Sequence, residues 1–244
     1  MPAALQCYNS SGNLQIDTQF MNMVLVQSGY LTINTSATPP TSWSAVTVSG
    51  LNNPIICCTV SGGAGYTVPF QVTYSVNPST GVGSHTFYIA SYLTSGSINV
   101  AYYIYDKQPN VVPSFGLVTW TSGGVVSFSS NYEPMRIVNM VNIPYGTPNE
   151  GYTPSTYTIS GTYSGQKLAV AFTNPKSYIT SDPYGSGVGR VYFQDAYSNN
   201  TGSTPYVQTS TYIPVDLAPS NNIGFSQPIG GQLFAVDVTN VYLP

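Results

Sequence analysis

Short runs of apolar and β-branched residues alternate with polar turn residues along the whole chain. In the segment 97–105, every second residue from Ile98 to Ile104 is a large apolar residue, which is typical of a β-strand. Turn-forming clusters such as SGGAG at 61–65 separate these runs. No segment combines an apolar period of about 3.6 residues with a charged opposite face. The pattern therefore predicts an all-β protein.

The runs form two series, separated by the polar, proline-containing stretch DKQPNVVPS at 106–114. The predicted strands of the first series are 14–16, 24–33, 45–49, 55–60, 68–76, 86–93 and 97–105. Those of the second series are 125–128, 135–143, 156–160, 167–172, 188–194, 206–215 and 232–242. The separating stretch is the best domain boundary in the chain.

The beginning of the first series recurs 112 residues later without a gap. The identical pairs are Leu5 and Leu117, Ser10 and Ser122, Gly12 and Gly124, Met23 and Met135, and Val26 and Val138. An internal repeat of this kind determines the architecture. We predict two tandem β-sandwich-like modules, residues 1–110 and 111–244, each opened by a similar β-hairpin. The alternative is a single long sandwich with a chance similarity between two hairpins.

The repeated hairpin makes two local predictions. Gly12 and Gly124 fall in its turn, where glycine permits the positive φ that other residues adopt at a cost of roughly 1 kcal/mol. The aromatic residues Phe20 and Tyr132 follow the turn at equivalent places, and we expect each ring to be buried in its own module.

The composition favours a protein that works inside a large assembly. Charged residues make up only 5 % of the chain, against roughly 25 % in an ordinary soluble domain. The five Lys and Arg residues are dispersed, which argues against nucleic acid as a partner. No run of 18 apolar residues predicts a membrane-spanning helix, and the N-terminus lacks the features of a signal peptide. We therefore expect synthesis in the cytoplasm of the producing cell and no membrane insertion.

Catalytic and metal-binding patterns are missing from the sequence. Cys7, Cys57 and Cys58 give no disulfide framework, and metal binding would need spaced Cys or His residues. The only histidine, His85, has no acid nearby in the sequence and no nucleophile motif to serve. Asp182 and Asp195 are the least improbable carboxylate pair, although turn capping explains both. We expect a non-enzymatic protein without a cofactor.

Two long, turn-rich segments in the second series carry tyrosines that could bind a partner. SDPYGSG at 181–187 contains Tyr184, and DAYSNNTGSTPYVQ at 195–208 contains Tyr197 and Tyr206. Tyrosine offers an apolar ring with a hydroxyl group, which suits both sugars and protein surfaces. The alternative is that these rings line strands or fill a contact between subunits.

The run YYIYDKQPNVVPSFGLVTWTSGGVVSFSSNYEPMRIV, together with the start MPAALQ, resembles small tailed-bacteriophage virion proteins encoded beside tail-fibre genes. The likeness covers about 60 of 244 residues and lies in pattern rather than in a catalytic motif. Ser129 stands where that family usually has Asp, and the first copy lacks the equivalent of Arg136.

The resemblance implies a structural component of the virion tail, in the tip, baseplate or fibre region, present in several copies and bound to other virion proteins. A receptor- or glycan-binding module of the tail, which would contact the host surface, is one alternative. A capsid decoration or head-fibre protein is another.

Overall fold

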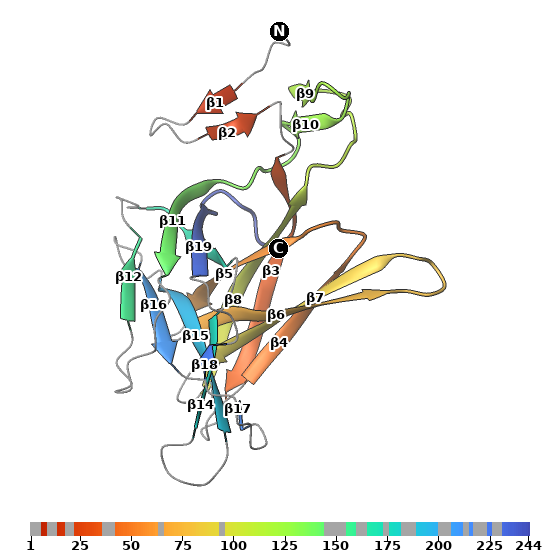
Figure 1. The fold of residues 1–244 in the computed structure, drawn as a ribbon. Coiled ribbons are helices and arrows are strands. Elements are labelled where there is room, and N and C mark those ends of the chain that lie inside the picture. Colours follow the sequence, from red (N-terminus) through yellow and green to blue (C-terminus); the bar gives the residue numbers. More distant parts are fainter. Residues whose placement is uncertain are drawn as a thin grey trace.

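The structure of the 244-residue chain is a computed structural model. It describes residues 6–8, 14–17, 22–35, 42–62, 66–92, 96–143, 155–159, 165–172, 176–181, 189–199, 206–211, 215–216, 224–225 and 231–244. In this part of the chain the regular elements are strands only, so the prediction of an all-β protein is confirmed. The strands form antiparallel sheets (Figure 1).

Nineteen strands are present in the described residues. Those of the first half are β1 (Gln6–Tyr8), β2 (Leu14–Asp17), β3 (Met23–Thr35), β4 (Ser42–Ser49), β5 (Ile55–Gly62), β6 (Tyr66–Val76), β7 (Gly83–Tyr92) and β8 (Gly96–Lys107). Those of the second half are β9 (Val118–Trp120), β10 (Val126–Ser129), β11 (Ile137–Ile143), β12 (Ser155–Thr158), β13 (Leu168–Phe172), β14 (Lys176–Ser181), β15 (Gly189–Asn199), β16 (Tyr206–Thr211), β17 (Val215–Asp216), β18 (Gly224–Phe225) and β19 (Gly231–Asp237).

In the central six-stranded sheet, equivalent strands of the two halves follow one another in the same order from each edge to the middle. Its order is β11-β19-β13-β5-β8-β3, so each half contributes the first and third strands after its hairpin and its last strand. A three-stranded sheet β4-β7-β6 belongs to the first half, and the sheet β12-β16-β15-β14-β18 belongs to the second. The strand order thus repeats in the same way as the sequence.

The two halves meet where β5 pairs antiparallel with β13. The paired residues are Cys58 and Val170, which are themselves 112 positions apart. Two equivalent residues that pair with each other in an antiparallel ladder mark a pseudo-two-fold axis through the sheet. We call the β5–β13 pair the junction.

A second coincidence shows that the repeat extends into the strands. The ladder between β3 and β8 has a bulge between Leu25 and Gln27, and the ladder between β11 and β19 has one between Ile137 and Asn139. These positions are again 112 residues apart. A bulge adds a residue to one strand and changes which side chains face each side of the sheet. Its retention in both halves keeps the same side-chain pattern.

Three buried clusters hold the sheets together. The first core cluster joins β3, β5 and β8 to β4 and β7 through apolar side chains that include Ile56, Val46 and Phe87. The second core cluster surrounds Leu168, Val170 and Leu233 in the second half. The third, which we call the junction cluster, lies on the other face of the six-stranded sheet. It combines Cys57, Ala101, Tyr103, Tyr105, Ala169, Ala171, Val236 and Val238.

The six-stranded sheet crosses the predicted boundary between residues 110 and 111, since β3, β5 and β8 precede it and β11, β13 and β19 follow it. Two fully separate modules would not share a sheet. The division into two sandwich-like modules stays a prediction, and the shared sheet shows that the two halves are structurally continuous.

Several strand boundaries differ from the sequence-based prediction. The strand predicted at 232–242 ends at Asp237, because the Asp237 carboxylate accepts hydrogen bonds from the backbone N–H and the hydroxyl of Thr239 and forms a turn there (2.9 and 2.6 Å). Strand β14 was not predicted. The expected burial of the Tyr132 ring is wrong, since this residue lies in a turn and is only partly buried. Gly12 and Phe20 lie outside the described residues.

Candidate interaction surface

The repeated segment forms two hairpins at one end of the molecule, which we call the hairpin end (Figure 1). Strands β1 and β2 pair as Gln6–Asp17, Cys7–Ile16 and Tyr8–Leu14. Strands β9 and β10 pair as Val118–Ser129, Thr119–Phe128 and Trp120–Val126. Each residue pair of the second hairpin lies 112 positions after the corresponding pair of the first hairpin. The irregularity in the register also recurs at the equivalent place. The sequence repeat is therefore a structural repeat.

The turn of the second hairpin follows the prediction for Gly124, whose φ is 76°. The Gly124 N–H donates to the carbonyl of Thr121 (2.9 Å), and the Thr121 N–H donates to the carbonyl of Val125 (2.8 Å). A left-handed residue is needed to close this turn, and glycine adopts that conformation without a steric penalty.

The second hairpin is anchored to the body of the protein through β10, whose four residues are all buried. The carbonyl of Ser127 accepts hydrogen bonds from the backbone N–H and the side-chain amide of Asn22 (3.0 and 2.6 Å). The hydroxyls of Thr119 and Ser127 are 2.8 Å apart, and the N–H of Val126 donates to the Asn110 side chain (3.0 Å). These contacts fix the hairpin end.

Large apolar side chains are exposed along this anchored hairpin and the segment before it. They are Val111, Val112, Phe115, Leu117 and Trp120, and the exposed Tyr8 lies in the first hairpin. Phe115 is the most exposed of them, at 77 %. A concentration of exposed apolar side chains within ten residues is typical of a protein–protein contact, whereas single exposed apolar residues are ordinary.

Tyr8 and Trp120 occupy equivalent places in the two hairpins. Both are exposed, at 57 % and 48 %. Each stands in the first strand of its hairpin, opposite the first pairing residue of the second strand. The repeat therefore presents two aromatic rings to the exterior rather than burying them.

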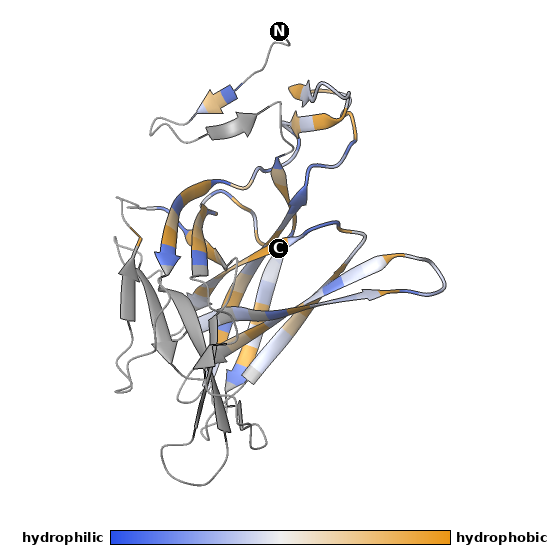
Figure 2. Cartoon of the chain, in the orientation of Figure 1, coloured by the Kyte–Doolittle hydropathy of each residue, from blue (hydrophilic) through white to orange (hydrophobic). Residues whose placement is uncertain are grey.

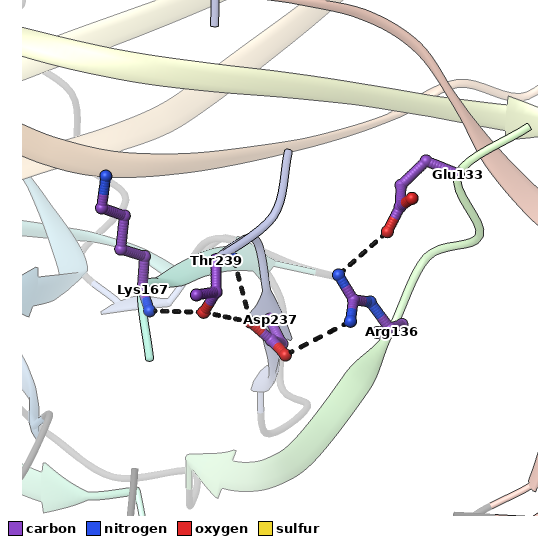
Figure 3. Close-up of polar contacts among 5 residues, drawn as sticks. All are labelled: Glu133, Arg136, Lys167, Asp237 and Thr239. Atoms are coloured by element: carbon purple, nitrogen blue, oxygen red, sulfur yellow. Dashed lines mark hydrogen bonds and ion pairs between the residues drawn. The ribbon is translucent and has the colours of Figure 1, made fainter. Parts of the chain in front are cut away.

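Charged side chains behind the hairpin end serve the fold. Arg136 lies 2.9 Å from Glu133 and 3.7 Å from Asp237. Figure 3 draws both ion pairs. Asp237 in turn accepts from Thr239, whose hydroxyl accepts the N–H of Lys167 (2.8 Å). The network ties the start of β11 to the start of β13 and the end of β19. Its carboxylates have polar partners from the chain itself, so it is a structural network.

Asp106 holds a turn in the first half. Both of its carboxylate oxygens accept backbone N–H groups, from Asn52 (2.9 Å) and Asn53 (3.0 Å), and the residue is buried. It borders a small cavity of about 280 Å³ together with the buried Gln108. The Asp106 carboxylate is used by the turn, and the other charged residue in the lining of this cavity is Lys107.

Two cysteines are buried, and the histidine packs against a tyrosine ring. Burial raises the pKa of the Cys57 and Cys58 thiols, so both remain protonated and unreactive at neutral pH. The His85 ring lies in β7 against the ring of Tyr74, with 4.8 Å between their centroids. Among the described residues, no three His, Cys, Asp or Glu side chains lie close enough to hold a metal ion. These residues also form no helix long and apolar enough to cross a membrane.

The tyrosines that the sequence suggested as binding residues are only partly placed by the structure. Tyr184 lies outside the described residues. Tyr197 is in β15 opposite Gln208, and Tyr206 is in β16 opposite Asn199, so the backbone brings the two positions onto neighbouring strands. The role of these three residues stays a prediction.

The sequence reasoning did not single out the apolar side chains of the hairpin end. A signal was present, because VVPSFGLVTW combines six large apolar residues with a proline and a glycine that prevent a regular strand. Apolar residues that cannot alternate in a strand have no sheet face through which to be buried together.

No known protein family, curated protein or solved structure matches this chain. The interpretation of function therefore depends on the residues and their geometry.

Proposed function

We propose that the chain is a non-enzymatic structural component of a bacteriophage virion, in the tail tip, baseplate or fibre region. In this proposal it binds a neighbouring virion protein through the hairpin end and is present in several copies. The observation that carries the binding role is the group of exposed apolar side chains around Phe115 on a hairpin anchored by buried β10. The assignment to a phage tail is supported by the resemblance of the repeated segment.

The physical basis of the contact is the removal of apolar surface from water, which contributes about 25 cal/mol per Å². An anchored hairpin loses little conformational freedom on binding, so less of this free energy is offset by ordering. The scarcity of charge favours the same role, because charged residues are depleted at the centres of protein interfaces.

The test uses particles of the phage that encodes the chain. Gold-labelled antibody against the chain should mark the tail of purified virions. The double variant Phe115→Ser and Trp120→Ser should be lost from particles while remaining folded in the lysate. The matched control is Tyr74→Ser, which removes an aromatic ring from β6 whose exposure, 61 %, lies between those of Trp120 and Phe115. Label on the head would favour a capsid decoration protein, and particles without label would overturn the virion assignment.

A further inference from the structure

The three-stranded sheet β4-β7-β6 has one face in the first core cluster and an opposite face that we call the outer face. Val46, Val48, Phe87 and Ile89 point into the cluster. Alternation along the strands therefore places the residues between them on the outer face. Its members are Trp43, Ala45, Thr47, Ser49, Gln71, Thr73, Ser75, Ser84, Thr86 and Tyr88.

An aromatic pair lies at one end of the outer face. The rings of Trp43 and Tyr88 meet edge to face, with 5.3 Å between centroids and 66° between planes. Trp43 is one of the two tryptophans in the chain, and it is 56 % exposed. Its cross-strand neighbour is the small residue Ala90. Tyr88 has Ala45 opposite it on β4 and Gln71 opposite it on β6. The geometry holds the indole ring in place and leaves it accessible.

Hydroxyl groups continue from the aromatic pair in two rows across the strands. Thr47 and Thr86 lie 2.9 Å apart through their hydroxyl oxygens, and Thr73 stands opposite Thr86 on the far strand. Ser49 and Ser84 lie 2.8 Å apart in the same way, and Ser75 stands opposite Ser84. A hydroxyl has one donor and two acceptor positions, so two paired hydroxyls still offer a donor and several acceptors.

Charge is missing from this face and from its surroundings in the sequence. No Asp, Glu, Lys or Arg occurs between Asp17 and Asp106, which includes all of β4, β6 and β7. Figure 2 colours this sheet mostly pale and orange, with blue at isolated positions. An uncharged face offers no electrostatic attraction to a charged ligand, and binding would cost the free energy of removing water from the charge.

We infer that the outer face is a binding site for a neutral carbohydrate chain. The apolar face of a pyranose ring packs on Trp43, and the sugar hydroxyls exchange hydrogen bonds with the Thr and Ser rows and with Gln71. An apolar surface beside convergent neutral polar groups is the chemistry that such a ligand requires. A protein partner would need a larger apolar area than one exposed ring provides. The inference does not depend on the proposed function of the hairpin end.

Affinity electrophoresis with soluble neutral polysaccharides (dextran, mannan and galactan) and with anionic alginate tests this site. At least one neutral polymer should retard the intact chain, and alginate should not. Trp43→Ala should weaken the retardation by about tenfold or more, as expected for loss of a central aromatic contact. The matched control Trp120→Ala removes the other tryptophan, which is 48 % exposed at the hairpin end, and should leave retardation unchanged.

Fluorescence distinguishes the two surfaces within the folded protein. In Trp120→Phe the only tryptophan is Trp43, and the retarding polymer should change its emission. In Trp43→Tyr the only tryptophan is Trp120, and its emission should stay constant. The inference is overturned if no neutral polymer retards the chain, if Trp43→Ala binds as tightly as the intact chain, or if alginate binds equally. It is also overturned if Trp43 mediates self-association in the absence of saccharide, which sedimentation would detect.

Discussion

At the start of its first long strand, the first half of the chain carries Val24, which is fully buried, whereas the second half carries Arg136 at the equivalent position. Val24 is surrounded by the protein and makes no ion pair. Arg136 reaches Glu133 and Asp237 with its guanidinium group. The same backbone bulge follows both residues, so the geometry of the strand does not require either side chain.

Asp106 near the end of β8 and Asp237 at the end of β19 also have different binding partners in the two halves. Asp106 accepts two backbone N–H groups from the turn before β5. Asp237 accepts from Thr239 and faces Arg136. Each carboxylate lies in the last two residues of the last strand of its half and accepts hydrogen bonds from a turn. The position of the acid is common to the two halves, whereas the groups that it binds differ.

In the junction cluster the two halves differ in the size of their fully buried side chains. The first half fills this face of the sheet with Cys57, Tyr103 and Tyr105, while the second half uses Ala169 and Val236. Partly buried residues of the second half, which include Met135, Phe234 and Leu243, also pack against this cluster. The repeat preserves strand order and register, whereas the side chains that fill the junction cluster differ between the halves.

The strongest way to break this arrangement is a charge at the junction. Val170→Asp places an unpaired carboxylate where the side chain is 2 % exposed, and should lower the free energy of unfolding by about 3–5 kcal/mol. Denaturant titration would measure it, with Trp43 reporting on the first half and Trp120 on the second in single-tryptophan variants. Both reporters should shift together because the halves share a sheet.

Gln166→Asp is the matched control, since this exposed neighbour should change stability by no more than about 0.5 kcal/mol. If only the reporter in the second half responds to Val170→Asp, the halves unfold separately and the shared sheet does not couple them.

High pH should unfold the protein through the first half. Burial, and then the neighbouring Tyr30, Cys57 and Cys58, raise the pKa of Tyr103 to about 12, and burial raises that of Tyr105 further. A raised pKa means that the folded state retains its proton longer. The stability from these groups is therefore complete below about pH 10, the tyrosine pKa in the unfolded chain, and is lost as the pH rises through the folded values.

Circular dichroism and tyrosinate absorbance, followed from neutral to alkaline pH, should show unfolding together with ionisation of the buried tyrosines. Tyr105→Phe should move the transition to higher pH, and its hydroxyl is not missed because it has no hydrogen-bond partner. Tyr242→Phe, at an exposed tyrosine, is the control. Ionisation of all tyrosines at about pH 10 without unfolding would contradict this account.

Asp106 in the first half should contribute more to the free energy of unfolding than the Arg136 ion pair in the second half. Asp106→Ala leaves two backbone N–H groups without acceptors and should cost about 2 kcal/mol. Arg136→Met removes an ion pair that is partly open to solvent and should cost about 0.5–1 kcal/mol. Chemical denaturation of both variants, with added salt, measures the difference. A larger loss for Arg136→Met would show that the second half depends on its ion pairs more than the geometry indicates.

The smallest effect is expected at the hairpin turn. Gly124→Ala forces a positive φ on a residue with a Cβ atom and should cost about 1 kcal/mol. Gly123→Ala, at the preceding residue, meets its nearest neighbour at an ordinary 3.7 Å and should be almost neutral. Thermal unfolding of the pair compares them directly. Equal losses in the two variants would mean that the turn is not held in the left-handed conformation.

The all-β class and most strands of the first half could be predicted because alternation and turn residues are local signals. Strand β14 was missed because KSYITS is short and has little apolar alternation, and its pairing partner β15 supplies the ordering. The repeat predicted two similar hairpins. The junction could not be predicted, since nothing local to Cys58 or Val170 states that they pair.

The candidate surfaces were harder to predict than the fold. The proximity of Trp43 and Tyr88 depends on the register between β4 and β7, which the sequence alone does not give. The position of Phe115 beside Trp120 follows from the chain, but its exposure depends on how β10 is anchored. The tyrosine-rich loops attracted attention through composition, which says nothing about tertiary contacts.

The pairing of Cys58 with Val170 relates this fold to a symmetric dimer. Equivalent residues that face each other across a two-fold axis are the signature of an isologous interface, the kind that joins two identical subunits. A chain containing one repeat would present the β5 edge to a second copy in this same register. Covalent linkage of the two copies makes that association intramolecular, with an effective concentration independent of how dilute the protein is. The 244-residue chain thus has the internal symmetry of a homodimer while remaining a single polypeptide.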